Sequence, residues 1–320
     1  MRRKKPWIIA VLAGVLVISA MASFAVAASI SIATGSTMGP YYQIGRAIAA
    51  AVSGSSEISA TAEVGNSQAA NIGLILEGEA EIAFLRSDVA AWAYDGEAMF
   101  DGTPLRSLRV IAALYSEALQ LVVSKAAGID SVAGLRGKRV GVGAAGSSAE
   151  SGARAVLRAA GLEYGDMSVE FIEFAEIISR FEDGSIDAGF AVAGVPTAAL
   201  ARLAEAGKGI TLIGFDDELM DKITEANPFF SERVIPAGTY GGIGTDILTP
   251  GVMTLLVTDG GVAEEVIYGF TKALFENVAE VRASHAMARS IALLSAPKGF
   301  TVPLHPGAAK YYEEAGLEAD

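Results

Sequence analysis

Short apolar runs alternate with longer stretches of helical periodicity along most of the chain. The apolar runs are rich in β-branched side chains and end at glycine or polar turns, which is typical of buried strands. We predict strands over residues 30–33, 58–64, 81–85, 110–114, 119–124, 139–142, 169–174, 188–192, 210–213 and 252–258. We predict helices over residues 41–52, 67–76, 88–94, 148–160 and 264–286. This alternation predicts an α/β fold in which helices cover largely parallel sheets.

One kind of unit, a strand followed by a glycine- and serine-rich turn and a helix, occurs at two distant places, residues 30–47 and 139–157. Because single cores rarely grow past about 250–300 residues, two such units in a chain of 320 residues predict two lobes. We place the crossings between the lobes near residues 119–124 and 234–240. This predicts a lobe I of residues 29–121 and 241–320 and a lobe II of residues 122–240.

The first 28 residues have the three parts of a secretory signal peptide. Four basic residues, Arg2 to Lys5, precede an apolar stretch over residues 7–21, and residues 25–27 (AVA) offer a cleavage site of small residues. The alternative is an uncleaved membrane anchor, because the apolar stretch comes close to the lower limit of about 17 residues for a spanning helix. With cleavage we expect an exported, periplasmic protein.

Composition limits the chemistry of the mature protein. The chain has 24 basic and 37 acidic residues, a net charge of −13 that becomes −17 once the four basic residues of the signal peptide are removed. Such a negative protein disfavours nucleic acid as a partner, since phosphate binding needs a basic surface. The absence of cysteine excludes disulfides, thiolate metal ligands and a thiol nucleophile, and two histidines argue against a histidine-rich metal site. We expect neither a metal nor a cofactor.

The turn of the second unit has the sequence GVGAAG over residues 141–146, which matches the pattern G-x-G-x-x-G. A strand before it and a helix after it are typical of a dinucleotide site, but an exported protein meets little NAD, so we prefer an anion site. A helix N-terminus offers free N–H groups with a partial positive charge, and Ser147 and Ser148 add hydroxyl donors. The structural alternative is a helix cap, because residues 147–150 (SSAE) have the sequence of a capping box.

Three further turns between a strand and a helix carry polar side chains. They are Thr34, Ser36, Thr37 and Tyr41 in the first, Asn66 and Ser67 in the second, and Ser87 and Asp88 in the third. The structural alternative is that each of these residues only caps the N-terminus of the helix that follows it. Because ligands bind at the carboxyl ends of strands in α/β sheets, four such turns together favour a binding site.

Arg86 stands at the end of a predicted strand in an acidic protein. Its guanidinium group can bind a carboxylate through two parallel hydrogen bonds. The alternative is an internal salt bridge to Asp88 or Glu81, and the sequence leaves both open. Catalytic motifs are absent: the chain has no G-x-S-x-G, no H-E-x-x-H and no P-loop. We therefore expect a protein that is not an enzyme.

Taken together, several segments resemble one family, the TAXI-type solute-binding proteins of TRAP (tripartite ATP-independent periplasmic) transporters. The resemblance runs through most of the mature chain and rests on ATGSTMGPYYQIG, NSQAANIGLILEGEAEIAFLRSD, LYSEALQLVVSK, LRGKRVGVGAAGSSAE, DGSIDAGFAVAGVPT, IPAGTYGG, VIYGFTKALFEN and PLHPGAAKYYEE. Arg86 and Pro40 depart from the pattern, since the family more often has an uncharged polar residue and a threonine there.

The resemblance implies a type II periplasmic-binding-protein fold whose two lobes close on a small organic anion, such as a dicarboxylate, a keto acid or an acidic amino acid. It implies delivery to a membrane permease driven by an ion gradient, and we expect a monomer. By matching position, the residues that face the ligand are Thr34, Ser36, Thr37, Tyr41, Asn66, Ser67, Ser87, Asp88, Gly143, Gly146, Ser147, Ser148, Val195, Pro196 and Tyr240, to which we add Arg86.

The resulting hypothesis is that the two glycine-rich turns face a shared cleft and that one carboxylate bridges them. Two alternatives stay open: a binding protein that serves a membrane sensor kinase, and an exported enzyme on the same fold.

Overall fold

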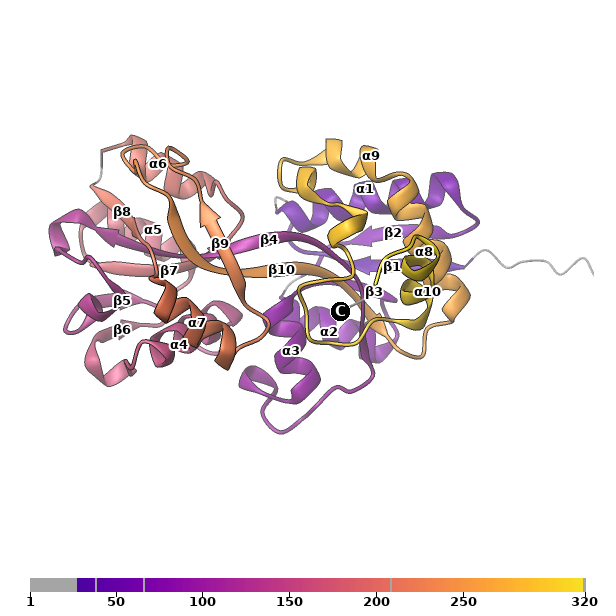
Figure 1. Ribbon diagram of the computed structural model, residues 1–320, viewed down its shortest axis with the longest axis horizontal. Coiled ribbons are helices and arrows are strands. Elements are labelled where there is room, and N and C mark those ends of the chain that lie inside the picture. The colour runs from indigo at the N-terminus through magenta and orange to yellow at the C-terminus, as the bar shows by residue number, and fades with distance from the viewer. Residues whose placement is uncertain (1–27, 38, 66, 208, 319–320) are drawn as a thin grey trace, which may run out of the picture.

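The computed structural model describes residues 28–318 except 38, 66 and 208, so that residues 1–27 of the predicted signal peptide lie outside the described part. It has two lobes joined by two long strands (Figure 1). The strands are β1 (Ser29–Ala33), β2 (Ser59–Glu63), β3 (Ile82–Arg86), β4 (Leu108–Ser124), β5 (Arg139–Gly141), β6 (Ser168–Glu170), β7 (Ala188–Ala193), β8 (Ile210–Ile213), β9 (Ser231–Ile235) and β10 (Ile247–Asp259). The α-helices are α1 (Pro40–Ser55), α2 (Gln68–Glu77), α3 (Ser87–Asp95), α4 (Ser148–Ala159), α5 (Phe174–Asp183), α6 (Ala198–Glu205), α7 (Asp217–Ala226), α8 (Glu264–Glu276), α9 (Val278–Ser284) and α10 (Pro306–Glu314).

The strands form one mixed sheet in the order β2-β1-β3-β10-β4-β7-β5-β6, with β8 paired to β4 and β9 paired to β10. The pairs β1–β2, β1–β3, β5–β6 and β5–β7 are parallel, whereas every pair that includes β4 or β10 is antiparallel. Each lobe thus has a small parallel sheet, and the long strands β4 and β10 connect the two. This confirms the predicted α/β, two-lobed fold.

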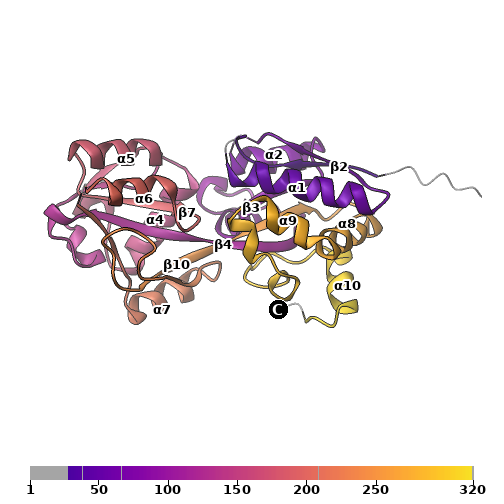
Figure 2. The ribbon, with the colours of Figure 1, turned by 90° about the horizontal axis from the view of Figure 1, so that it is seen from above.

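Helices cover both sides of this sheet. In lobe I, α1, α8 and α9 lie on one side and α2 and α3 on the other, while in lobe II α5 and α6 lie opposite α4 and α7 (Figure 1). Seen from above, β4 and β10 run between the lobes (Figure 2). Three apolar clusters follow this arrangement, one under α1 and α8, one under α5 and α6, and one that spans both lobes and includes an edge-on contact between Trp92 and Phe229 at 5.2 Å.

The prediction of two strands over residues 110–114 and 119–124 is wrong, because β4 is continuous from Leu108 to Ser124. The polar residues between the two predicted strands interrupt the apolar pattern but not the strand. Glu117 is buried there and accepts hydrogen bonds from hydroxyl groups. β4 pairs with β10 from Leu108 to Ala118 and with β7, on its other side, from Ala118 to Val123. Ala118 therefore marks the point where β4 passes from one lobe into the other.

The chain returns along β10, and the predicted lobe boundaries stay a prediction. Ile243 and Ile247, which follow the predicted boundary at residue 240, pack with the lobe II cluster that includes Tyr240. The predicted helix over residues 264–286 is divided into α8 and α9 at Asn277. Its side-chain amide donates to the carbonyl of Ala273 at 2.8 Å, and side-chain hydrogen bonds of this kind compete with the helical pattern.

Four helices, α5, α6, α7 and α10, and the strand β9 were not predicted, and the predicted strand over residues 169–174 is shorter, since α5 begins at Phe174. Among the described helices, none combines the length and the apolar character that a membrane crossing requires.

Candidate ligand site

A cavity of about 320 Å³ lies between the lobes, and we call it the interlobe cavity. Lobe I contributes the first glycine-rich turn and the start of α1, together with side chains from α2, β3 and β4. Lobe II contributes the end of β7. The lining residues are Gly35, Ser36, Gly39, Pro40, Tyr41, Gln68, Arg86, Glu117, Val192, Ala193, Gly194 and Met287. The carboxyl ends of β1, β3 and β7 therefore meet at this cavity, as expected for a ligand site in an α/β sheet.

The N-terminus of α1 opens on the interlobe cavity without a side-chain cap. Gly39 is the N-cap residue and Pro40 occupies the first turn, where its fixed φ suits a helix start and its missing N–H costs nothing. The Gly39 N–H donates to the Ser36 carbonyl at 2.8 Å, which folds the turn back on itself. The first N–H groups of a helix have no acceptors within the helix, so the start of α1 attracts an acceptor or an anion.

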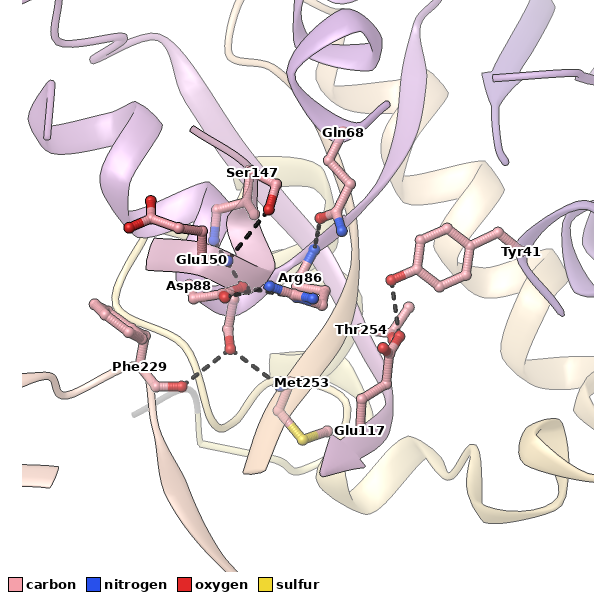
Figure 3. A network of polar contacts seen from close by, with 12 residues as sticks. Tyr41, Gln68, Arg86, Asp88, Glu117, Ser147, Glu150, Phe229, Met253 and Thr254 are labelled. Atoms are coloured by element: carbon pink, nitrogen blue, oxygen red, sulfur yellow. Dashed lines mark hydrogen bonds and ion pairs between the residues drawn. The ribbon is translucent and has the colours of Figure 1, made fainter. Parts of the chain in front are cut away.

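Arg86 forms an internal salt bridge with Asp88, which is one of the two roles that the sequence left open for it. Its Nε and Nη2 atoms donate to the two carboxylate oxygens of Asp88 at 3.1 and 2.6 Å, and both side chains are buried (Figure 3). Burial opposes the charge on Arg86, but Asp88 outweighs it and raises the pKa of Arg86 above its usual range. Glu81 instead accepts from the Ser31 N–H. Arg86 nevertheless lines the interlobe cavity, so its remaining N–H groups can still meet a ligand.

Glu117 places a carboxyl group in the same cavity, and the sequence analysis missed it. Its Oε1 accepts from the hydroxyls of Tyr41 and Thr254, both at 2.8 Å (Figure 3). Burial raises the pKa of Glu117, while Arg86 and the two hydroxyls act in the opposite direction. In the sequence, the only sign of a buried carboxyl group at this position is that Glu117 is a single acidic residue between two apolar runs. Gln68 was also missed; it holds the end of β3 by accepting from the Arg86 N–H at 2.7 Å.

The second glycine-rich turn lines a different cavity. Ser147 caps α4 by accepting from the Glu150 N–H at 3.2 Å, whereas the Glu150 carboxylate accepts from Arg154 Nε at 2.9 Å. Gly143 has φ +100°, and a Cβ atom there would lie 2.9 Å from the Glu150 nitrogen, so this glycine serves the tight start of the helix. Gly146 lines a cavity of about 500 Å³ between α3, α4 and α7. Ser147 is thus the cap of α4, but its own N–H donates to the Ala144 carbonyl, so the reciprocal contact of a capping box is not formed. The structure also does not bring the two turns to one cavity.

Several other predicted site residues make internal contacts. Thr34 donates to the Glu63 carbonyl at 2.6 Å, Ser67 caps α2, Ser87 donates to the Phe229 carbonyl at 3.0 Å, and Tyr240 donates to Gln120 at 2.6 Å. These four side chains hold elements together, and none of them lines the interlobe cavity.

The remaining predicted residues differ in position. Thr37 and Pro196 are exposed, Ser148 is half-buried at the start of α4, and Val195 lines a smaller cavity beside the interlobe cavity. Asn66 lies outside the described residues. Of the predicted site residues, the interlobe cavity therefore gathers Ser36, Tyr41 and Arg86, and Asp88 reaches it through Arg86.

Three solved structures share this fold at low sequence identity. A TctC solute binding protein from Polaromonas is 17% identical with a TM-score of 0.55, over 91% of this chain and 99% of that one. The periplasmic aliphatic sulphonate binding protein SsuA from Escherichia coli is 15% identical with a TM-score of 0.50, over 89% and 78%. The GluR0 ligand binding core in complex with L-glutamate is 13% identical with a TM-score of 0.50, over 85% and 98%.

These likenesses establish the fold, which is that of periplasmic solute-binding proteins. The sequence itself gives the closer relationship, because residues 32–316 match the NMT1-like family from β1 to the end of α10. The chain belongs to the NMT1-like family.

Proposed function

We propose that the protein captures a small organic anion between its two lobes and delivers it to a TRAP-type membrane permease. The interlobe cavity carries this proposal, because the uncapped start of α1 and the buried guanidinium group of Arg86 line one space. Its volume of about 320 Å³ falls at the lower end of the range of small-molecule sites, about 300–1,000 Å³. The solute is therefore small.

The cavity offers donors at one place and an acceptor at another. Ser36, the first N–H groups of α1 and the free N–H groups of Arg86 donate to a carboxylate of the solute. The hydroxyls of Tyr41 and Thr254 both donate to Oε1 of Glu117, which leaves its Oε2 as an acceptor for the solute. A hydroxyl or amino group next to the carboxylate can donate to this oxygen. Hydroxy acids and amino acids fit this arrangement, together with dicarboxylates that carry such a group.

Closure of the lobes is the step that retains the solute. The lobes are joined by β4 and β10, so these strands act as the hinge. A solute shifts the protein toward the closed state only if it binds that state more tightly. Closure must also bring the predicted contacts of lobe II to the solute. The start of α4 has to approach the interlobe cavity with Gly143, Gly146, Ser147 and Ser148, and so does the part of lobe II that carries Val195, Pro196 and Tyr240.

The relatives support the solute class, and the sequence supports the partner. Two structural neighbours bind anionic solutes, SsuA an aliphatic sulphonate and the GluR0 core L-glutamate. The predicted signal peptide supports export to the periplasm, and the resemblance to TAXI-type proteins supports a TRAP permease rather than a sensor kinase as the partner.

A screen of keto acids, dicarboxylates and amino acids by thermal shift, followed by calorimetry, tests the solute class. A solute at about 100 times its Kd raises the free energy of unfolding by about 2.7 kcal/mol. Binding of neutral sugars or cationic amines instead of anions would overturn the proposal.

Delivery is tested with proteoliposomes that hold the candidate permease. Uptake of the identified solute must depend on the added protein and on an ion gradient, and an ionophore must abolish it. Recovery of the solute by mass spectrometry after long incubation separates binding from catalysis, since an enzyme returns a converted product.

A further inference from the structure

A second, smaller cavity of about 210 Å³ lies beside the interlobe cavity, and we call it the hinge cavity. Tyr115 and Ser116 of β4 line it, together with Arg233 of β9 and with Arg289 and Ser290 of the short 3₁₀ helix Met287–Ser290. Elements of both lobes thus meet there, next to the strand that crosses between them.

The hinge cavity carries two positive side chains, and none of the described residues that line it is acidic. Neither Arg233 nor Arg289 makes a side-chain hydrogen bond or an ion pair with any described residue, and no aspartate or glutamate lines this cavity. Arg233 is half-buried, and its Nε atom is fully buried without an acceptor. Arg289 is exposed, so the half-buried Arg233 is the arginine whose charge most needs a partner.

Hydroxyl groups complete the lining. The Tyr115 hydroxyl is buried and makes no hydrogen bond with a described residue. A buried N–H or O–H group without a partner costs free energy, and guanidinium groups match the oxygens of carboxylate, sulfonate and phosphate groups in particular. An oxyanion would satisfy these donors and compensate the charge at the same time.

We propose that the hinge cavity is a second binding site, in which Arg233 and Arg289 hold one oxyanion between the two lobes. Gly194 and Met287 line both cavities, and they are so close that a Cβ atom on Gly194 would lie 2.2 Å from the Met287 Cε atom. The oxyanion is either a second charged group of the captured solute, which reaches past Met287, or a separate inorganic anion. In the first case the inference rests on the proposed function, and in the second it stands alone.

An oxyanion at this position also favours one arrangement of the lobes. Arg233 lies on β9, and Arg289 lies on the 3₁₀ helix Met287–Ser290, whose Ala288 packs with the lobe I cluster under α1 and α8. Their like charges therefore repel each other across the cavity when no anion is bound. A bound oxyanion reverses this repulsion and holds the two sides together.

The first experiment uses inorganic sulfate as the probe, at constant ionic strength maintained with sodium chloride. Sulfate is titrated by calorimetry and by thermal shift into the wild-type protein and into the Arg233→Gln and Arg289→Gln variants. Arg202→Gln is the matched control, because Arg202 is an exposed arginine on α6 away from both cavities. We expect saturable sulfate binding in the wild type and in Arg202→Gln, and at least a tenfold loss of affinity in each of the other variants.

The second experiment uses the solute that the screen identifies. If the oxyanion belongs to the solute, its affinity falls at least tenfold in Arg233→Gln and sulfate competes with it. If a separate anion binds, the solute affinity is unchanged while sulfate binding still depends on Arg233. A wild type that binds no screened solute but binds sulfate through Arg233 contradicts the proposed function and supports the hinge site.

The inference is overturned if sulfate binds equally well to the wild type and to Arg233→Gln. It is also overturned if the wild type binds no sulfate and the solute affinity is the same in all variants. Retained binding of the solute in that second case would leave the proposed function intact.

Discussion

Arg86 and Arg233 line two neighbouring cavities and differ in whether an acidic side chain compensates their charge. Arg86 is buried and makes two hydrogen bonds to Asp88, and the interlobe cavity that it lines also contains the carboxyl group of Glu117. Arg233 is half-buried in the hinge cavity and has no acidic partner there. A cation that the protein neutralises itself is part of the scaffold, whereas a cation left without a partner is available to a ligand. The same substitution at the two sites should therefore have opposite effects.

The largest expected effect is that of Arg86→Met. Methionine fills much of the volume of the side chain but leaves the buried Asp88 carboxylate without its cation. Breaking a buried ion pair from one side costs about 3–5 kcal/mol, so we expect the free energy of unfolding to fall by that amount in urea titrations. The double variant Arg86→Met/Asp88→Leu is the control, since it removes both charges and should recover most of the loss. A loss below about 1 kcal/mol in the single variant would show that Asp88 does not need Arg86.

Glu117→Gln should act in the opposite direction at neutral pH. Burial raises the pKa of Glu117 above its ordinary value of 4.5, so the folded protein holds this proton more tightly than the unfolded chain. The stability that this contributes is complete below pH 4.5 and is lost as the pH rises through the folded-state pKa. Glutamine keeps an acceptor for the two hydroxyls and carries no charge, so we expect it to stabilise the protein by about 1–2 kcal/mol at pH 7.

The measurement is urea unfolding of both proteins from pH 4.5 to pH 8, where the difference between them should grow with pH. The charged and titratable groups that act on Glu117 are Arg86, Asp88, Tyr41 and Tyr115. If Glu117→Gln is the less stable protein at pH 7, the attraction between the charged Glu117 and Arg86 outweighs the cost of burying the charge of Glu117.

Ser36→Ala and Ser147→Ala compare the two glycine-rich turns. Ser147 caps α4, so its loss should lower the free energy of unfolding by about 0.5–2 kcal/mol. Ser36 lines the interlobe cavity, and its loss should weaken solute binding by about 0.5–1.5 kcal/mol, since one hydrogen bond to the solute is lost. Chemical denaturation and calorimetry on both variants separate the two effects. Equal losses of solute affinity would show that closure brings both turns to the solute, as the sequence predicts.

These turns also show which features of the site could be predicted from the sequence and which could not. The glycine-rich turns predict where α1 and α4 begin, and Ser67 and Ser147 predict the caps of α2 and α4, because capping and turn geometry are local. Which turn opens on the interlobe cavity is not local: it depends on where β4 exchanges β10 for β7, and residues 115–118 look like a gap in the apolar pattern. Two polar residues of the cavities, Glu117 and Arg233, were missed for a related reason. Glu117 is one acid in an apolar run, and Arg233 lies in a strand that the sequence did not predict.

Arg233→Met is the smallest expected effect and the most direct comparison with Arg86→Met. Burial lowers the pKa of Arg233, and no neighbouring charge acts against this. The charge of Arg233 therefore lowers the free energy of unfolding. Methionine keeps the apolar part of the side chain and removes this charge. Because the side chain is only half-buried, we expect a gain of about 0.5 kcal/mol in the free energy of unfolding without oxyanions. In saturating sulfate the order should reverse, since only the wild type gains from the bound anion. A loss of stability in sulfate-free buffer would mean that Arg233 already has a partner in solution, and its contrast with Arg86 would then be one of exposure rather than of charge compensation.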